Sequence, residues 1–244
     1  MNITLSQLDH QRFGKVTAKI NVEPGQDLSQ MLTWCETQRV ELLIARIKTD
    51  DIYSVQNMER AGFFLTDTLV YFANKKIVAS QLSLPQICSW RLATPGDAET
   101  LEKLAAKIFT NYKGHYHADQ RLNKSDCDLV YSSWAANSCL NSAVADVVFL
   151  LSQSDAMIGF ITVKVIDPVK RVAEIVLNGV DPDFQKHGHY SSLVSLVKNW
   201  AVENGIQQII VSTQVTNDSV QKVWCRQGFE PSYSFYTFHK WFSA

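Results

Sequence analysis

The residues most suited to chemistry in this sequence form one short segment, Gln185 to Tyr190, which reads Gln-Lys-His-Gly-His-Tyr. A stretch with helical spacing follows it. The first turn of a helix carries backbone N–H groups without intrahelical partners and a partial positive charge, so a phosphate or pyrophosphate is a natural ligand there. Gly188 would let the backbone approach the anion closely. Lys186, and His187 or His189 when protonated, would add cationic donors. The alternative is an ordinary strand-to-helix turn without a ligand.

Two predicted elements hold this segment in place. The residues from Ala173 to Val180 are apolar and β-branched, as in a buried strand. After the segment, apolar side chains recur on one helical face until Gly205 stops the helix. These side chains are Leu193, Leu196, Val197, Trp200 and Ala201. The sequence therefore predicts strand, loop and amphipathic helix in succession.

Further strands are predicted on both sides of this unit. Runs with strand character at 147–151, 157–165 and 171–180 are separated by turn residues, which predicts three antiparallel strands leading into the loop. Val176–Val180 and Ile209–Thr213 are predicted to lie parallel, because the helix between them would form a crossover. The result is a mixed sheet in an α/β fold.

The loop and its flanks resemble a family signature. Gln-x-x-Gly-x-(Gly or Ala), after a strand that ends in Val-x-Pro, is typical of the acyl-CoA pyrophosphate loop of the GNAT N-acyltransferases. Gln185 and Gly188 match this pattern, whereas Tyr190 stands where the second Gly or Ala is usual. Upstream, the stretch 91–98, Arg-Leu-Ala-Thr-Pro-Gly-Asp-Ala, is similar to the start of a GNAT domain. The resemblance implies a GNAT fold from Arg91 to the end of the chain.

The resemblance also implies how acyl-CoA, the co-substrate, would bind without a metal. Backbone groups of Asn178 and Val180 would hold the pantetheine arm where two parallel strands separate. The pyrophosphate would be held by Gln185, Lys186, His187, Gly188, His189 and Tyr190. Asn217 would bond the pantetheine or only cap the final helix, and Trp224 would lie at the same site.

Two further motifs narrow the resemblance to a subgroup. Tyr-x-x-Trp-x-x-Asn-Ser from Tyr131 and Thr-Gln-x-x-Asn from Thr213 are similar to motifs of the dTDP-amino-deoxysugar N-acyltransferases, of the dTDP-fucosamine type. This implies transfer of an acetyl or 3-hydroxybutanoyl group by direct attack through a tetrahedral intermediate. The acceptor would be a dTDP-linked amino sugar, first dTDP-3-amino-3,6-dideoxy-D-galactose or -glucose. Such nucleotide sugars serve surface polysaccharide and lipopolysaccharide biosynthesis.

Polar aromatic residues are predicted to line the acceptor site. The stretch 111–119 lacks any helical or strand period and offers flat rings and polar atoms suited to a base or sugar. A plain surface loop and core aromatics are the alternatives. The predicted acceptor residues are Tyr116, His117, Tyr131, Trp134 and Asn137. His115, His117 and Asp119 suggest a metal, but the other histidines lie at 10, 187, 189 and 239, so no metal site is predicted.

Proton transfer is less well defined by the sequence. Relatives often carry, seven residues after the counterpart of Asn217, a tyrosine that protonates the leaving thiolate; this chain has Trp224 there. An indole N–H donates a hydrogen bond but is no practical acid. Two candidate bases are predicted, Glu174 in the strand before the loop and His117. An enzyme that orients a neutral amine would need neither.

An internal similarity divides the chain. Strand, helix, Gly-Phe and strand recur, with Ser54-Val55-Gln56 matching Ser219-Val220-Gln221 and one extra residue before the second Gly-Phe. Residues 1–85 are therefore predicted to be a degenerate half-GNAT structural domain. Residues 86–244 would be the acyl-CoA-binding catalytic domain.

Composition excludes several classes of function. The 244-residue chain is 46% hydrophobic with net charge −1, which predicts a packed core and neither nucleic-acid binding nor membrane insertion. Its five cysteines form no C-x-x-C pair, and we expect reduced thiols and a cytoplasmic location. The partners would be acyl-CoA and a nucleotide-linked amino sugar, with a homodimer left open. The other hypotheses are a GNAT enzyme for another small amine or a protein amine, and a non-catalytic acyl-CoA sensor.

Overall fold

Residues distant in the sequence share a unit in the computed structural model, which describes residues 2–82, 84 and 87–242. The first of two units combines residues 1–70, 113–127 and 233–244, and the second combines 71–112 and 128–232. These units differ from the predicted domains 1–85 and 86–244, because 113–127 and most of the last strand belong to the first unit. Residues 85 and 86, at the predicted boundary, lie outside the described residues.

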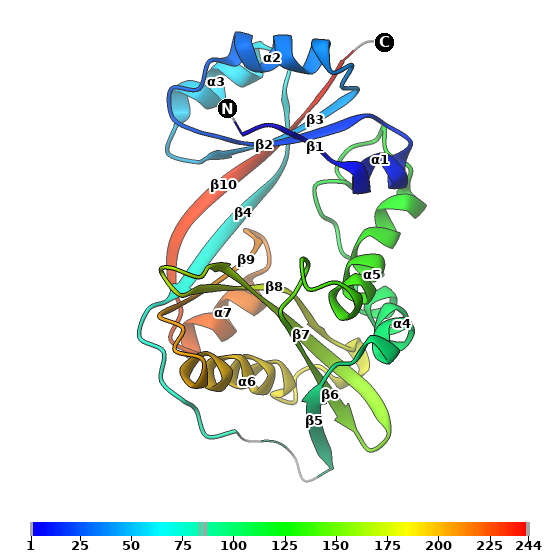
Figure 1. The fold of residues 1–244 in the computed structure, drawn as a ribbon, viewed down its shortest axis with the longest axis vertical. Helices are drawn as coiled ribbons and strands as arrows, with labels where there is room; N and C mark the ends of the chain where they lie inside the picture. Colours follow the sequence, from blue (N-terminus) through cyan, green and yellow to red (C-terminus); the bar gives the residue numbers. More distant parts are fainter. Residues whose placement is uncertain (1, 83, 85–86, 243–244) are drawn as a thin grey trace. The chain divides into compact units, whose positions relative to one another are not determined.

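The first unit is a sheet with two helices on one face (Figure 1). Its strands lie in the order β1-β2-β3-β10-β4. Their bounds are Thr4–Leu5 for β1, Thr17–Val22 for β2, Leu42–Lys48 for β3, Phe64–Asn74 for β4 and Glu230–Trp241 for β10. The helices are α1 (Gln7–Phe13), α2 (Leu28–Thr37) and α3 (Ile52–Arg60). Strands β2 and β3 pair in parallel across α2, whereas β10 pairs antiparallel with β3.

Alternation along the strands builds the core of this unit. Every second residue of β2 and β3 faces α2 and α3, because successive side chains of a strand point to opposite faces. The facing residues are Ala18, Ile20, Val22, Leu43, Ala45 and Ile47 from the strands and Met31, Cys35, Val55 and Met58 from the helices. The side chains of Asp27 and Asp51 accept hydrogen bonds from the first turns of α2 and α3, which fixes where each helix begins.

The second unit carries helices on both faces of its sheet (Figure 1). Its strands lie in the order β4-β9-β8-β7-β6-β5. The bounds are Cys88–Leu92 for β5, Val147–Gln153 for β6, Ala156–Asp167 for β7, Val172–Val180 for β8 and Gln208–Gln214 for β9. The helices are α4 (Ala98–Ile108), α5 (Lys124–Leu140), α6 (His189–Glu203) and α7 (Asp218–Arg226), with short 3-10 turns at Pro95–Asp97 and Pro182–Phe184. On one face of the sheet, Leu101 of α4 and Ala135 of α5 belong to the same core cluster as Phe160 of β7. On the other face, Leu193 of α6 lies beside Gly159 of β7.

The two segments that resemble each other in sequence also share a backbone course. Helices α3 and α7 have nine residues each, and the residues before them, Asp51 and Asn217, have the same backbone angles within 1°. Each helix ends before a glycine with positive φ, +81° at Gly62 and +85° at Gly228. Aligned by their helix ends, the two segments need no extra residue, and Ser54 then lies opposite Val220 instead of Ser219. This alignment places Met58 opposite Trp224, and both side chains are buried.

A close contact between α4 and β8 leads to a stability prediction. A Cβ atom on Gly179 would lie 2.6 Å from Cγ2 of Ile108, so Gly179→Ala forces Ile108 or the helix to move. We expect a loss of about 1 to 3 kcal/mol in the free energy of unfolding, as for other overpacked sites. Ile108→Ala in the same chain removes the obstructing atom, so the double variant should lose less than the sum of the two single losses. Urea unfolding measures this coupling, and strictly additive losses would contradict the assigned contact.

Candidate acyl-CoA site

The strand that precedes the loop, β8, is distorted where the site begins. The register with β7 shifts between Ile161 and Val163, so that Thr162 alone faces two residues of β8. This β-bulge is held by a hydrogen bond of 2.9 Å from the backbone N–H of Leu177 to Thr162 Oγ1. The parallel ladder of β8 with β9 ends at Ile175, directly before the bulge. A bulge bends its strand, which explains why the ladder does not continue.

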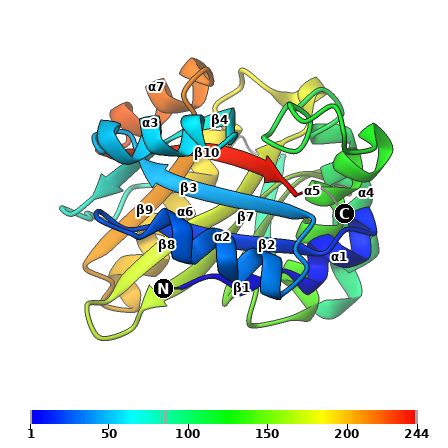
Figure 2. The same ribbon diagram turned by 90° about the horizontal axis from the view of Figure 1, so that it is seen from above.

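The predicted pairing of these strands is right in direction and wrong in register. Strands β8 and β9 run parallel and side by side (Figure 2). However, residues 172–175 pair with 208–211, instead of 176–180 with 209–213. The bulge cannot be read from the sequence, because it depends on which residue of β7 lies opposite.

The end of β8 offers backbone groups on the side of β9. The N–H of Asp181 donates to the carbonyl of Ile158 at 2.8 Å, which marks a hydrogen-bonded position of the β7–β8 pair. Because such positions alternate along an antiparallel pair, the N–H and C=O groups of Asn178 and Val180 point away from β7. The carbonyl of Val180 accepts from Gln185 Nε2 at 3.0 Å. An extended chain with amide groups can pair with such an edge as an added strand does.

The loop itself leaves the N-terminus of α6 open. Lys186 and Gly188 both have positive φ, +67° and +84°, and such a turn directs backbone N–H groups into an anion-binding concavity. The first turn of α6 has no side-chain cap, and Lys186, His187 and Gly188 are exposed. A Cβ on Gly188 would meet no atom within 4 Å, so the space beside this backbone is empty of protein. The residues present therefore fit a pyrophosphate.

An ion pair network ties α4 to the start of the loop. Lys107 Nζ lies 2.8 Å from Asp181 and 2.7 Å from Asp183. The hydrogen bonds with these carboxylates, Asp181 first, raise the pKa of Lys107. Asp181 also accepts from the backbone N–H of Asp183 at 3.0 Å, which fixes the 3-10 turn before Gln185. Lys107 is not predicted as a site residue from the sequence, because no local motif links it to residues 181 and 183.

Trp224 and Tyr190 form a pair at the side of α6. Trp224 Nε1 donates to Tyr190 Oη at 2.8 Å, and its ring lies 5.4 Å from that of Phe72. Trp224 is only 1% exposed, and its indole N–H is already used by the hydrogen bond to Tyr190. Burial raises the pKa of Tyr190, although the hydrogen bond from Trp224 opposes this, so the phenol stays protonated at neutral pH. Tyr190, not Trp224, therefore carries the acidic hydrogen of this pair.

A double-mutant cycle tests the strength of this hydrogen bond. Tyr190→Phe removes the accepting hydroxyl, Trp224→Phe removes the donating indole, and the double variant removes both groups. We expect a coupling of about 1 kcal/mol in the free energy of unfolding, because the surviving partner is left with an unsatisfied group. Urea unfolding at neutral pH provides the four values. A coupling near zero would show that the pair contributes nothing to folding.

Asn217 and the predicted acceptor residues of the second unit have partners of their own. Asn217 Nδ2 donates to Thr213 Oγ1 at 3.0 Å, and its Oδ1 accepts from Ser219. Tyr131 stacks on Phe109 with ring centres 4.9 Å apart and lies 6.5 Å from the ring of Trp134. Tyr131 and Trp134 pack partly buried against the core, and Asn137 is half-buried. The structure thus brings Tyr131 and Trp134 together, and their contact with a sugar stays a prediction.

The segment 113–127 builds a polar network inside the first unit. Tyr116 is buried, donates to Asp9 at 2.8 Å and accepts from Lys19 at 3.0 Å. His117 is half-buried, and its Nδ1 accepts from the backbone N–H of Gly114 at 3.3 Å. Asp9 is held ionised: burial opposes its charge, but Lys19 and the hydrogen bonds around it lower its pKa. Acceptor binding by Tyr116 and His117 stays a prediction.

Three buried side chains of the same unit form a hydrogen-bonded chain. His239 Nδ1 lies 2.8 Å from Asp119, and His239 Nε2 lies 2.9 Å from His115 Nδ1. Asp119 also accepts from Trp241 Nε1 at 2.8 Å. Since a carboxylate only accepts, a neutral His239 donates from Nδ1 and accepts from His115, which leaves the lone pair of His115 on Nε2. This chain of hydrogen bonds can hold His115 as a neutral base. No sequence motif predicts it, because His239 is 124 residues away from His115.

The buried His115 predicts a loss of stability in acid. Burial is the main cause that lowers the pKa of His115 well below its usual value, and a protonated His239 would lower it further. Below about pH 6.5 the unfolded chain takes up a proton here that the folded chain does not, so stability falls as the pH falls, by up to about 1.4 kcal/mol per pH unit. Urea unfolding from pH 7 to pH 5 should show this slope, and His115→Phe should reduce it. An equal slope in both proteins would contradict the assignment.

The two predicted bases lie in different settings. Glu174 belongs to the paired part of β8, opposite Lys164 of β7 and Ile210 of β9, and is half-buried. It precedes the bulge by two residues and Asn178 by four. His117 belongs to the first unit, as described above. Their roles as bases stay predictions.

Within residues 2–82, 84 and 87–242, no helix is both long and apolar enough to cross a membrane. Over the same ranges, no three His, Cys, Asp or Glu side chains are grouped so as to hold a metal ion.

The spore coat polysaccharide biosynthesis protein SpsD of Bacillus subtilis (strain 168) is 25% identical over 150 residues, which cover 60% of this chain and 48% of that relative. The match thus spans about half the length of the relative. A GCN5-related N-acetyltransferase from Sphaerobacter thermophilus is 12% identical with a TM-score of 0.68, covering 98% of this chain and 76% of that one.

A tandem GNAT protein from the clavulanic acid biosynthesis pathway is 12% identical with a TM-score of 0.61, covering 93% of this chain and 76% of that one. At identities this low, the likeness to solved structures concerns the fold alone, and it confirms the predicted GNAT fold. The family model for the acetyltransferase (GNAT) family matches residues 103–229, more than half of the 244 residues. The chain therefore belongs to the GNAT family of acetyltransferases, enzymes that use acetyl-CoA as co-substrate.

Proposed function

We propose that this enzyme transfers an acyl group from acyl-CoA to the amino group of a dTDP-linked amino sugar. One observation supports acyl-CoA most directly: the exposed, uncapped start of α6 follows a strand whose ladder with β9 has ended. The nucleotide sugar is supported by the relationship to SpsD, which is named for spore coat polysaccharide biosynthesis. The motifs from Tyr131 and Thr213 favour dTDP-3-amino-3,6-dideoxy-D-galactose or -glucose.

The residues of the second unit would divide the work of binding. Acyl-CoA supplies the thioester that the amine attacks. The N–H groups of Asn178 and Val180 would pair with the amides of the pantetheine arm, as in an added strand. The backbone of Lys186 to Tyr190 would bind the pyrophosphate, and Lys186 would add a positive charge. Holding the reactants in this way supplies much of the rate enhancement of a transfer between two bound groups.

We also propose that the N-terminal part, residues 1–85, is a degenerate half of the same fold. The equal helix lengths and the matching glycines of α3 and α7 support this proposal. The first copy has Met58 at the position of Trp224, and its turn between β2 and α2, residues 23–27, lacks the Gln-x-x-Gly motif of the anion loop. Its role would be structural.

A donor and acceptor panel tests the proposal. The protein is incubated with several dTDP-amino sugars, each with acetyl-CoA and with 3-hydroxybutanoyl-CoA, and free thiol release is followed. We expect release that requires one particular sugar, and the preferred donor gives the acyl length. CoA binding without release from any pair would contradict the sugar and favour another small amine, a protein amine or a sensor of acyl-CoA.

A further inference from the structure

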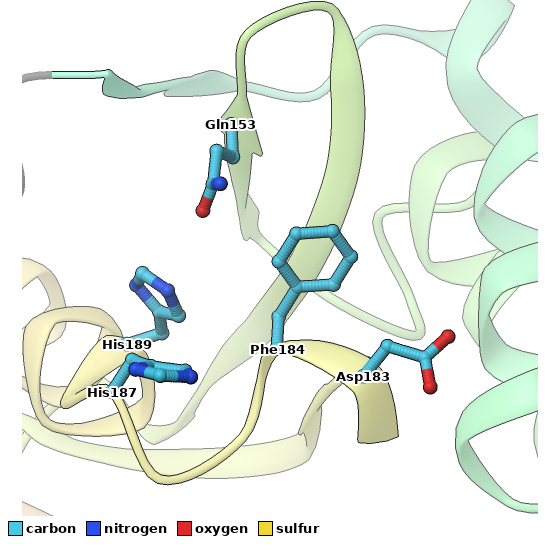
Figure 3. Close-up of a pocket in the computed structure, with 5 residues that line it drawn as sticks. All are labelled: Gln153, Asp183, Phe184, His187 and His189. Carbon is cyan, nitrogen blue, oxygen red and sulfur yellow. The ribbon is translucent and has the colours of Figure 1, made fainter.

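A cavity of about 330 Å³ opens beside the loop (Figure 3). Its lining residues are Gln153, Asp183, Phe184, His187 and His189. Gln153 is the last residue of β6, and the strand order β9-β8-β7-β6 places β6 and β9 on opposite sides of β8. The volume falls within the usual range for a small-molecule site. The chemical group that enters this cavity is therefore not the group that pairs with the end of β8, although both can belong to one ligand.

His189 gives this cavity an unsatisfied polar group. Its side chain lines the cavity, the residue is 3% exposed, and Nδ1 has no hydrogen-bond partner among the described residues. A buried polar atom without a partner is costly, and in native structures it usually indicates a ligand or a water. His189 is also the first residue of α6, where the helix carries partial positive charge. An anionic oxygen would satisfy both features.

The remaining lining residues suit a nucleotide better than a lone phosphate. Figure 3 shows His187 and His189 together at the start of α6, with the Phe184 ring and the Gln153 amide around the same space. An aromatic face can stack on a base, and an amide can both donate to and accept from a base edge. The Asp183 side chain points away from the histidines, and its carboxylate pairs with Lys107, which reduces its repulsion of an anion.

We propose that this cavity binds the 3′-phosphorylated adenosine of acyl-CoA, with His189 as the residue that recognises the 3′-phosphate. The proposal rests on the proposed acyl-CoA site. With the pyrophosphate at the loop, the pantetheine arm would extend toward the β9 side of β8. The other end of the same molecule is then the adenosine, and the cavity lies on the other side of the loop. His189 is thus a specificity-determining residue that separates CoA from 3′-dephospho-CoA.

Calorimetric titration of the full-length protein tests this assignment. The probes are CoA, 3′-dephospho-CoA and adenosine 3′,5′-bisphosphate. We expect the unaltered protein to bind CoA about tenfold or more tightly than 3′-dephospho-CoA, as one charge-assisted hydrogen bond predicts. His189→Phe keeps an aromatic ring without nitrogens. It should abolish binding of the bisphosphate and weaken CoA more than 3′-dephospho-CoA, so that the preference between the two disappears. His10→Phe, at an exposed position of α1, is the matched control and should bind all three as the unaltered protein does.

The outcomes separate this assignment from the proposed function. Equal affinity of the unaltered protein for CoA and 3′-dephospho-CoA would overturn the cavity assignment and leave the acyl-CoA site intact. Equal weakening of both probes by His189→Phe would also overturn it, because His189 would then serve the pyrophosphate or the fold. Binding of neither probe to the unaltered protein would overturn the acyl-CoA site itself. The comparison on the unaltered protein remains decisive if His189→Phe does not fold.

Discussion

Replacing Gly188 with valine is expected to abolish the binding of CoA, by more than about a hundredfold, in a protein that still folds. Gly188 has φ +84°, a conformation that costs a residue with a Cβ roughly 1–2 kcal/mol, so the turn should relax and redirect its N–H groups. The added methyl groups would project into space that holds no protein atom within 4 Å of the Cβ position. That space is where the pyrophosphate would lie. Calorimetric titration with CoA measures the loss directly.

Gly25→Val provides a matched control for backbone strain. Gly25 has φ +76°, is exposed and would place its Cβ in equally open space, but it lies in the turn between β2 and α2. The two variants should therefore lose similar amounts of stability in urea, whereas only Gly188→Val should lose CoA. Retained CoA binding by Gly188→Val would show that the loop does not hold the pyrophosphate. Equal loss of binding in both variants would show that strain acts on the whole molecule.

Local patterns were sufficient to predict most elements of this fold. The apolar spacing after His189 and the stop at Gly205 predict a helix that the structure places at His189–Glu203. The β-branched run before the loop predicts β8, and the acidic pair Asp50-Asp51 predicts the start of α3. Such features depend on neighbouring residues, because caps and side-chain periodicity act over a few positions. The short helix α1 and the strand β1 were not predicted.

Local sequence patterns did not predict the features that depend on residues distant in the sequence. The bulge in β8 is set by its partner strand β7, and the predicted register with β9 was wrong for that reason. Trp224 reads as a site residue by its distance from Asn217, yet the structure buries it against Phe72 with its N–H on Tyr190. The environment of a side chain depends on tertiary packing, which sequence spacing alone does not determine.

Replacing Asp119 with asparagine is expected to destabilise the first unit by about 3 kcal/mol. The reason is that the buried network loses the carboxylate that accepts hydrogen bonds from both His239 and Trp241. Burial opposes ionisation of Asp119, but the hydrogen bonds from His239 and Trp241 hold its pKa below the usual value. Asparagine keeps one acceptor oxygen, and its amide group would face the N–H of either His239 or Trp241. One donor would then remain buried without a partner.

Hydrogen exchange shows whether this loss is confined to the segments that Asp119 joins. We expect Asp119→Asn to speed exchange in 113–127 and 233–242 most, whereas Asp50→Asn, at an exposed position of the same unit, should leave exchange unchanged. The low pKa of Asp119 means that its contribution is complete above about pH 3.9 and is lost as the pH falls through its folded pKa. The two proteins should therefore approach equal stability in strong acid. Equal stability of Asp119→Asn and the unaltered protein at pH 7 would mean that His239 and Trp241 find other partners, and that Asp119 does not hold this segment to β10.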